Sequence, residues 1–499
     1  MMPMTAPDGT HSRELLQSIA RRVMLARGLA PEFTAAALLE LDAIRAPAVT
    51  AGPAAADLRA LPWCSIDNDD SRDLDQLSVA DARPDGATRI LVAIADVTSV
   101  VTPGSAIDAH ARQNTTSVYT TARIFPMLPE KLSTDLTSLA LDADRLAVVI
   151  DLLFSAGGAL AASEIYPAAV RNRAKLAYHG VAAWLDGTAP VPPAVAAVAG
   201  LADNIRRQHR VADQLAELRH QHGALTLETR QTRPVFAGAV LTGLVADPSN
   251  SAKRLIEELM VAANGVTARF LAARGFPSLR RVVRVPKYWS RIVSLAAEHG
   301  TTLPGEPDAK ALELFLVAAK SADPVNFPDL SLSVIKLLGA GEYVLELPGA
   351  SVAGHFGLAV RDYAHSTAPN RRFPDVITQR LVKAALAGQP PPYADGELAA
   401  LARHCTEQED AAKKVERQVE KSAAAILLCA SIGREFAAIV TGASAKGTWV
   451  RLSSPPVEGK LDRGPAGLQV GDRLRVKLVS TDVERGFIDF VGVGHVVRS

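Results

Sequence analysis

The stretch Asp67-Asn-Asp-Asp-Ser-Arg-Asp-Leu-Asp-Gln76 carries five carboxylates within ten residues. Carboxylates this dense repel one another unless a cation neutralises them. A solvated acidic turn is the simplest alternative. An EF-hand loop that starts at Asp67 is excluded, because its sixth position is Arg72 instead of glycine and its twelfth is Ser78 instead of glutamate. The stretch therefore indicates an oxygen-ligand site for Mg²⁺, with Mn²⁺ as a second choice, that can hold a phosphate.

The segments that follow this loop predict an α+β body. Residues 89–96 and 146–154 are rich in apolar and β-branched side chains, which is typical of strands. Helical periodicity appears at 197–221, 253–274, 290–299, 308–321 and 376–387. Because there is no regular βαβ repeat, we expect a mixed or antiparallel sheet covered by helices.

The C-terminal part changes character after residue 434. Residues 405–434 are rich in Glu, Lys and Ala and predict a helix that serves as a spacer. Short alternating strands then follow at 436–440, 447–452, 473–479 and 486–490, separated by Gly, Pro and Asp turns. This pattern predicts a small five-stranded barrel of the OB type.

The N-terminal part predicts a small helical domain. Apolar residues recur at helical spacing between residues 12 and 46, with a break at 28–31. A helix-turn-helix or winged-helix unit and a plain helical cap both fit this pattern. A Pro/Gly/Ala-rich connector spans 46–56. We expect three domains: a helical one at 1–54, a catalytic one at 55–430 and a barrel at 431–499.

Composition restricts the class of protein. Of 499 residues, 48% are hydrophobic, which is enough for a large core, and the formal charge is only +1, so a polyanion must be bound by local patches. The cysteines Cys64, Cys405 and Cys429 form no metal-binding pattern, which favours a reducing, cytoplasmic location. No segment has the length and apolarity of a membrane span, so we expect no membrane insertion.

A second group of candidate residues lies at Tyr363-Ala-His-Ser-Thr-Ala-Pro-Asn-Arg-Arg-Phe-Pro-Asp375. Arg371 and Arg372 follow a proline and are suited to gripping phosphate oxygens, although adjacent arginines are often plain surface residues. A third group is Glu257 and Glu258, at the start of an apolar helix. These glutamates could accept hydrogen bonds from sugar hydroxyls, or could simply stabilise the helix N-terminus.

The order of these motifs resembles the catalytic domain of the ribonuclease II family, called RNB. The resemblance spans about residues 55–430. Its blocks are 65–77, 94–97, 103–105, 116–119, 126–133, 138–139, 144–146, 255–264 and 363–375. Residues 433–490 are similar to the S1-type barrel that ends such enzymes. Members typically carry two cold-shock barrels before the catalytic domain, and we expect this chain to be atypical in lacking them.

The resemblance implies roles for individual residues. Asp67, Asp73 and Asp75 match the metal-binding aspartates, and Asp75 matches the one most strictly required for cleavage. Arg371 matches the arginine that contacts the scissile phosphate, with Arg372 beside it on the RNA. Tyr119 matches the tyrosine at the closed end of the channel.

The resemblance also implies contacts to bases and sugars. Phe236 aligns with the aromatic partner of the channel tyrosine, so the terminal bases would be clamped by stacking. Glu257 or Glu258 would contact ribose, which only RNA offers with a 2′-hydroxyl. The barrel would supply Lys446, Trp449 and Arg451 for gripping a single strand.

Two departures from the family pattern concern the site. Gln76 stands where the family usually has a fourth aspartate; its amide oxygen can coordinate a metal but supplies no charge, so a second ion should bind more weakly unless Asp69 or Asp70 substitutes. The usual Ser-Pro-Ile before the arginine is Ala-Pro-Asn370, and Phe373 replaces a tyrosine. These changes leave Arg371 in place but alter its surroundings.

The resemblance implies a Mg²⁺-dependent 3′-to-5′ exoribonuclease that hydrolyses single-stranded RNA to nucleoside 5′-monophosphates and acts as a monomer. Gln76 and the altered arginine motif motivate an alternative, an RNA-binding relative with weakened catalysis. A third class, a DNA-binding regulator built on the N-terminal helices, has only Arg21, Arg22 and Arg27 in its support. No protein partner can be inferred from the sequence.

Overall fold

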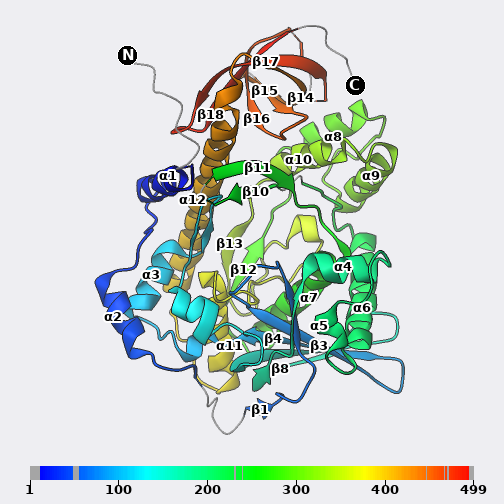
Figure 1. Ribbon diagram of the computed structural model, residues 1–499. Helices are drawn as coiled ribbons and strands as arrows, with labels where there is room; N and C mark the ends of the chain where they lie inside the picture. The colour runs from blue at the N-terminus through cyan, green and yellow to red at the C-terminus, as the bar shows by residue number, and fades with distance from the viewer. Residues whose placement is uncertain are drawn as a thin grey trace.

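The computed structural model describes residues 12–48, 55–229, 232–238, 240–444, 447–465, 467–468 and 471–493. Its body is built on a seven-stranded sheet with the order β1-β8-β7-β4-β3-β2-β9, at the bottom of Figure 1. The strands are β1 (Ala56–Asp57), β2 (Cys64–Asp67), β3 (Gln76–Ala82), β4 (Thr88–Ala95), β7 (Asp144–Phe154), β8 (Leu160–Arg171) and β9 (Ala174–Ala177). Only β1 with β8 and β2 with β9 pair in parallel. The expected mixed sheet and the strands at 89–96 and 146–154 are confirmed.

Helices cover one face of the sheet. They are α3 (Ala106–Asn114), α4 (Tyr178–Leu185), α5 (Pro193–Ala196), α6 (Leu201–Gln221), α7 (Ser251–Ala273) and α11 (Phe373–Leu386). Ile90, Val92 and Ile94 of β4 point into this layer and are fully buried against Leu255 and Ile377. Alternation along the strand places Leu91 and Ala93 in a second core on the opposite face, as the two-residue repeat of a strand requires.

Several smaller elements extend from the body. Short β5 (Val118–Tyr119) pairs with β6 (Ile124–Phe125), β10 (Thr232–Ala237) with β11 (Val240–Ala246), and β12 (Ser278–Val282) with β13 (Glu342–Glu346). Between β12 and β13, α8 (Trp289–Glu298), α9 (Ala309–Ala322) and α10 (Phe327–Leu338) enclose their own small core. Single turns occur at η2 (Val97–Ser99), η3 (Lys131–Leu136), η4 (Phe356–Leu358) and η5 (Cys429–Ser431).

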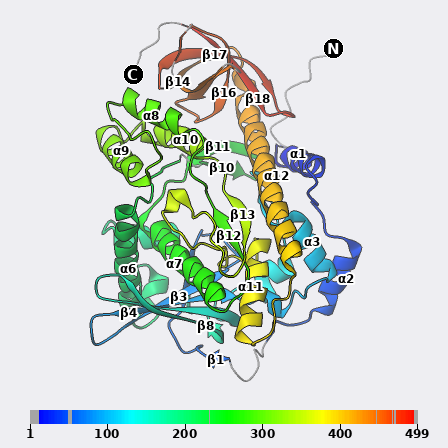
Figure 2. The same ribbon diagram turned by 180° about the vertical axis from the view of Figure 1, so that it is seen from behind.

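The long helix α12 (Asp395–Leu428) connects the body to the barrel, as Figure 2 shows from behind. The helix begins before the expected segment 405–434 and also ends before it does. It is not a free spacer, because its residues Val415, Val419 and Ala423 are completely buried. The closed barrel has the order β14-β15-β16-β18-β17 and confirms the predicted fold. Its strands are β14 (Glu435–Ser444), β15 (Gly447–Leu452), β16 (Glu458–Arg463), β17 (Arg473–Asp482) and β18 (Phe487–Gly492).

The barrel shares its hydrophobic core with the end of α12. Ala424, Ala425 and Leu428 of the helix lie in one cluster with Val450 and Phe490 of the barrel. At the turn before β18, Gly486 has a φ of +68°, and a Cβ there would come within 3.2 Å of the α12 backbone. A side chain at this position would push the barrel away from the helix.

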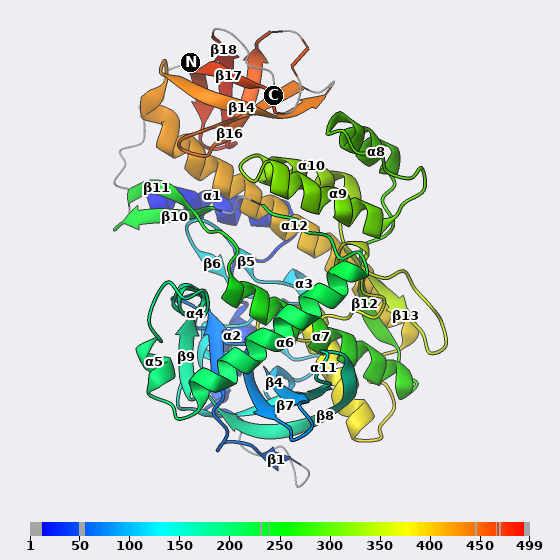
Figure 3. The ribbon, with the colours of Figure 1, turned by 90° about the vertical axis from the view of Figure 1, so that its right-hand side faces the viewer.

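The N-terminal region is helical, with α1 (Ser12–Ala26) and α2 (Ala35–Ala43). The apolar face of α1 packs on α12, and Figure 3 shows it beside β10 and β11. Ala37 of α2 belongs instead to the main core, and Glu40 accepts the backbone N–H of Ala106 at the start of α3. Both helices are therefore packed onto the body of the protein. None of the described helices combines the length and apolarity needed to cross a lipid bilayer.

Candidate active site

The aspartate-rich segment forms the loop between β2 and β3. Asp67 is the last residue of β2, and Asp75 immediately precedes β3. Ser138 holds the loop in place through two hydrogen bonds. Its hydroxyl accepts the N–H of Leu74 at 3.0 Å and donates to the carbonyl of Arg72 at 2.7 Å. The loop thus presents its carboxylates from a fixed edge of the sheet.

Asp75 is the point where the two main sequence motifs meet. The backbone N–H of Asn370 donates to its Oδ1 at 2.9 Å, and Nε of Arg371 donates to its Oδ2 at 3.0 Å. Asp75 is only 1% exposed. Burial raises its pKa to about 7, although the charge of Arg371 and the N–H of Asn370 act in the opposite direction. A buried carboxylate of this kind favours a nearby cation.

Arg371 lies among several anionic or polar groups. Burial opposes its charge, but Asp75, Tyr119, Asp67 and Asp73 together raise the pKa of its guanidinium. It therefore stays charged throughout the pH range of protein function. No described residue forms a hydrogen bond to its two Nη groups, so these donors are available to a phosphate.

Tyr119 reaches this site through strand-like pairing of the chain around Arg371. Ser117 N–H donates to the Arg371 carbonyl at 3.0 Å, and Phe373 N–H to the Thr115 carbonyl at 2.8 Å. The ring of Tyr119 is 40% exposed and its hydroxyl donates to Oδ2 of Asp73 at 3.2 Å. An aromatic surface is therefore held directly beside the aspartate loop.

A cavity of about 200 Å³ adjoins these residues. Tyr119 and Arg371 line it from one side, and Glu409, Lys413 and Glu416 of α12 line it from the other. Glu416 also accepts the backbone N–H of Tyr119 at 2.8 Å. The sequence reasoning missed these α12 residues, because only the fold places them opposite the arginine motif.

The donors expected to hold a metal are chemically suited to it. Asp67, Asp73, Asp75 and Gln76 offer only oxygen ligands, the kind that Mg²⁺ prefers. However, no three His, Cys, Asp or Glu side chains among the described residues are arranged to hold an ion. Oδ1 of Asp67 instead accepts the N–H of Asn68 and the hydroxyl of Ser71. Binding of an ion would require these side chains to turn toward one another.

Three other predicted site residues are already held in ion pairs. Nε of Arg372 lies 2.8 Å and its Nη2 2.6 Å from the carboxylate of Asp375, which is fully buried. Glu258, 2% exposed, is paired with Arg219, whose Nε lies 2.8 Å away. Arg451 of β15 is paired through both Nη groups with Asp329 of α10. RNA contacts by these three residues stay predictions; the pairs of Glu258 and Arg451 join segments far apart in the chain, whereas Arg372 pairs within its own turn.

The remaining predicted residues are spread more widely. The side chain of Glu257 is 57% exposed, with Nη2 of Arg219 at 3.9 Å. Phe236 lies on β10, and the guanidinium of Arg13 covers its ring at 4.3 Å. Trp449 is half-buried on β15 opposite Gly442, and Lys446 lies outside the described residues.

The motif departures noted in the sequence occur at the centre of the site. Asn370 is fully buried; its Oδ1 accepts the Thr137 hydroxyl at 2.5 Å, while its Nδ2 has no partner among the described residues. Gln76 is buried at the start of β3. The altered residues thus surround Asp75 without displacing Arg371.

Two family models match the chain. The RNB domain model covers residues 55–388, which is more than half of the sequence. The chain belongs to the RNB family. The model of the RNase II-type exonuclease C-terminal S1 domain matches residues 434–493, so the barrel is an S1 domain. The family resemblance found in the sequence is confirmed.

Curated relatives of this RNB protein are bacterial ribonucleases. It is 29% identical over 469 residues to Ribonuclease R of Escherichia coli (strain K12), covering 87% of this chain and 57% of that one. It is 32% identical over 340 residues to Exoribonuclease 2 of Escherichia coli O1:K1 / APEC, covering 67% and 51%. The chain therefore spans little more than half the length of these relatives.

Solved structures share the fold. The apo form of Mycoplasma genitalium RNase R aligns with a TM-score of 0.84 and 22% identity over 96% of this chain and 78% of that one. Yeast Ssd1, described as a pseudonuclease, aligns with a TM-score of 0.67 and 15% identity over 84% and 52%. Because both have this fold, the fold alone does not decide whether an RNB domain cleaves RNA.

Proposed function

We propose that this RNB protein is a hydrolytic exoribonuclease that shortens single-stranded RNA from its 3′ end and releases nucleoside 5′-monophosphates. The observation that carries the proposal is the pairing of Arg371 with Asp75, which are 296 residues apart in the chain. This pair joins an acidic loop suited to metal binding with a guanidinium whose Nη donors bond to no described residue and are available to a phosphate.

Each residue of the site has a proposed role. Arg371 neutralises the charge that develops on the scissile phosphate, and Asp75 fixes its guanidinium in position. Tyr119 stacks on the terminal base, and the cavity beside it holds the terminal nucleotide. A divalent ion held by Asp67, Asp73 and Asp75, with Gln76 as a neutral ligand, supplies activation of the attacking water when bound.

Discrimination between RNA and DNA is assigned to Glu257. Its carboxylate is mostly exposed, whereas Glu258 is buried in its pair with Arg219. Glu257 is therefore the better placed of the two glutamates to accept a hydrogen bond from a ribose 2′-hydroxyl. Of the two glutamates that the sequence suggested as ribose contacts, Glu257 is therefore the one proposed.

The central test follows a 5′-labelled single-stranded RNA with Mg²⁺ and with EDTA. We expect progressive shortening and release of 5′-monophosphates only with the metal, and loss of both in Asp75→Asn. Equal rates in EDTA, or full activity of Asp75→Asn, would exclude the proposed mechanism.

A second candidate function is RNA binding with weakened cleavage. It is favoured by the absence of a ready metal-binding trio among the described residues and by Gln76. It predicts tight binding of the same RNA without release of monophosphates at any Mg²⁺ concentration. The shortening assay and a binding assay on one preparation therefore separate the two functions.

A further inference from the structure

Two adjoining cavities lie on the outer side of α7, away from Asp75. The first, of about 210 Å³, lies between the end of α7, β12, β13 and the loop 347–352. The second, of about 360 Å³, lies between α6, α7 and the β7–β8 hairpin. They share Arg361 and Asp362, and we call the two together the α7 groove. Its larger part already reaches the range of about 300–1,000 Å³ of small-molecule sites.

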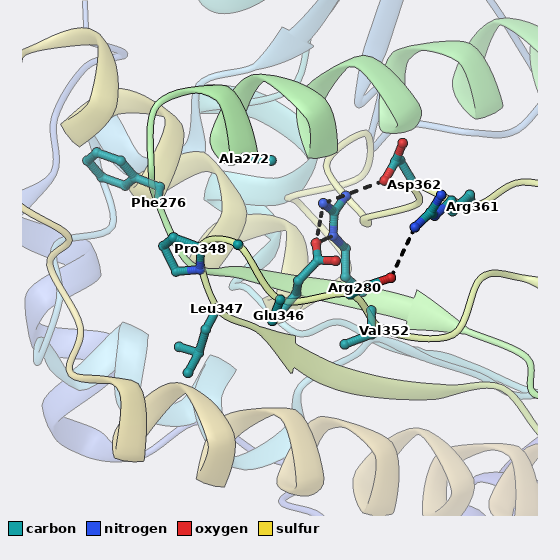
Figure 4. A pocket seen from close by; sticks show the side chains of 12 residues that line it. Ala272, Phe276, Arg280, Glu346, Leu347, Pro348, Val352, Arg361 and Asp362 are labelled. Carbon is teal, nitrogen blue, oxygen red and sulfur yellow. Dashed lines mark hydrogen bonds and ion pairs between the residues drawn. The ribbon is translucent and has the colours of Figure 1, made fainter.

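Neighbouring arginines of β12 face opposite sides of the strand and separate this groove from the active site. Arg281 points toward α12, where its Nη2 lies 2.8 Å from Glu409, which lines the cavity beside Arg371. Arg280 points into the α7 groove and pairs with Glu346, and Figure 4 shows its guanidinium between Glu346 and Asp362. The groove is therefore a separate site that touches the same strand.

One end of the groove has unused hydrogen-bond donors. The side chain of Arg280 is only 3% exposed, yet its Nη1 has no partner among the described residues. Among the described residues, Arg361 donates only to the hydroxyl of Ser351, at 3.2 Å, and Arg269, which lines the second cavity, has no ion pair. Nη1 of Arg280 is closed off from solvent, so the donors that a ligand in the groove can reach are those of the exposed Arg361 and Arg269.

The charge of the lining favours an anion. Arg219 and Glu258 neutralise each other, as do Arg280 and Glu346. Arg269 and Arg361 then face the single carboxylate of Asp362, which leaves one positive charge. This surplus is small, so it suits a compact anion and not a long polyanion.

The other end of the groove is apolar. Its wall is formed by aliphatic and aromatic side chains, namely Phe154, Leu160, Leu215, Val261 and Val360. A ligand that fills both ends must have a flat apolar part and an anionic group at the other end. Asp362, at the junction, can accept hydrogen bonds from hydroxyls placed between the two.

We propose that the α7 groove binds a nucleoside monophosphate, with its base in the apolar end, its ribose hydroxyls on Asp362 and its phosphate on Arg361 and Arg269. The choice of this ligand rests on the proposed function, which produces such molecules. The groove would then sense the product of the chain's own reaction.

The test is equilibrium binding of AMP to the full chain in EDTA, by calorimetry. Arg361→Ala and Arg269→Ala change exposed side chains, and each should weaken AMP binding about tenfold, the effect of losing one charge-assisted contact. Adenosine and inorganic phosphate should each bind at least tenfold more weakly than AMP. Arg210→Ala, an exposed arginine of α6 outside the groove, is the matched control and should bind AMP normally.

The outcome is separable from that of the RNA assay. Arg371→Ala should bind AMP in the α7 groove as the natural protein does, whereas Arg361→Ala should bind it about tenfold more weakly, whether or not the protein cleaves RNA. An active enzyme whose AMP binding is the same in Arg361→Ala and Arg210→Ala would overturn the inference. Binding of a twelve-nucleotide RNA but not of AMP at Arg361 would overturn it too, in favour of a strand-binding surface.

Discussion

The hydroxyl of Tyr119 lies 3.2 Å from Oδ2 of Asp73 and donates to it. This bond connects the aromatic surface of the site to the aspartate loop, so the two contributions of Tyr119 can be separated. Tyr119→Phe keeps the ring and should change cleavage only slightly. Tyr119→Ala removes stacking, which is worth about 1–3 kcal/mol per base, and should stop digestion at longer products. Product ladders check this, and equal ladders for Phe and Ala would show that the hydroxyl is what matters.

Arg371 and its neighbour Arg372 should fail in different ways. Arg371→Ala should lower the rate of RNA cleavage by about 10²–10³, as expected when one transition-state donor is lost. It also removes the partner of the buried Asp75, but the raised pKa of Asp75 lets this carboxyl take up a proton, so the loss of stability should be smaller than in Arg372→Ala. Arg372→Ala leaves the buried Asp375 unpaired and should cost about 3–5 kcal/mol of stability. Thermal unfolding and initial rates measured on both variants test the contrast. An inactive but fully stable Arg372→Ala protein would instead support its predicted contact with RNA.

The raised pKa of Asp75 predicts a pH effect on stability. Burial lifts it from 3.8 to about 7, so between these values the folded protein holds a proton that the unfolded chain has lost. The contribution of Asp75 to the free energy of unfolding therefore falls as the pH rises through this window. In EDTA, Asp75→Asn should gain stability relative to the natural protein between pH 5 and pH 8. A constant difference across this range would contradict the buried, proton-binding state.

Gln76→Asp should restore the charge that the family motif has at this position. With four carboxylates, we expect the Mg²⁺ concentration for half-maximal RNA cleavage to fall, because charge count sets the affinity of such sites. Without metal the added carboxylate is buried near Asp75 and should lower the melting temperature. Gln76→Leu serves as the control that cannot coordinate. Identical Mg²⁺ dependence in all three proteins would remove position 76 from the metal site.

The pair between Arg451 and Asp329 should hold the S1 barrel to α10. Arg451→Ala and Asp329→Ala each leave one buried charge and should cost about 3–5 kcal/mol, and the charge-swapped double variant should recover part of it. Thermal unfolding of the singles and the double forms the cycle. If only Arg451→Ala weakens RNA binding while stability is unchanged, Arg451 contacts RNA as the sequence predicted.

The sequence was most informative where local patterns determine structure. The strand at 89–96 became β4 because its β-branched residues Ile90, Val92 and Ile94 line one buried face while Leu91 and Ala93 line the other. The aspartate loop and Arg371 were found as motifs, and the structure brings them together at Asp75. The pairing of Arg371 with Asp75 could not be predicted from the motifs, because two residues 296 positions apart share no local sequence signal.

Ion pairs were the main feature that the sequence concealed. Arg372, Glu258 and Arg451 all have the side chains of RNA-binding residues, yet each is engaged by a protein partner. For Glu258 and Arg451 the partners are distant in sequence, so nothing near them reveals the pairing. Asn370 differs from these three residues. Its departure from the motif was visible in the sequence, but its burial, with an Nδ2 that has no partner among the residues described, was not.

The shared core of α12 and the S1 barrel limits how the barrel can be studied. A truncation at residue 431 would uncover Ala424, Ala425 and Leu428, since these side chains belong to the hydrophobic cluster of the barrel. The shortened protein would then tend to aggregate through this new apolar surface. Loss of RNA binding after such a deletion would therefore say little about the barrel itself. Point substitutions on the outer surface of the barrel are the better way to measure its contribution to RNA binding.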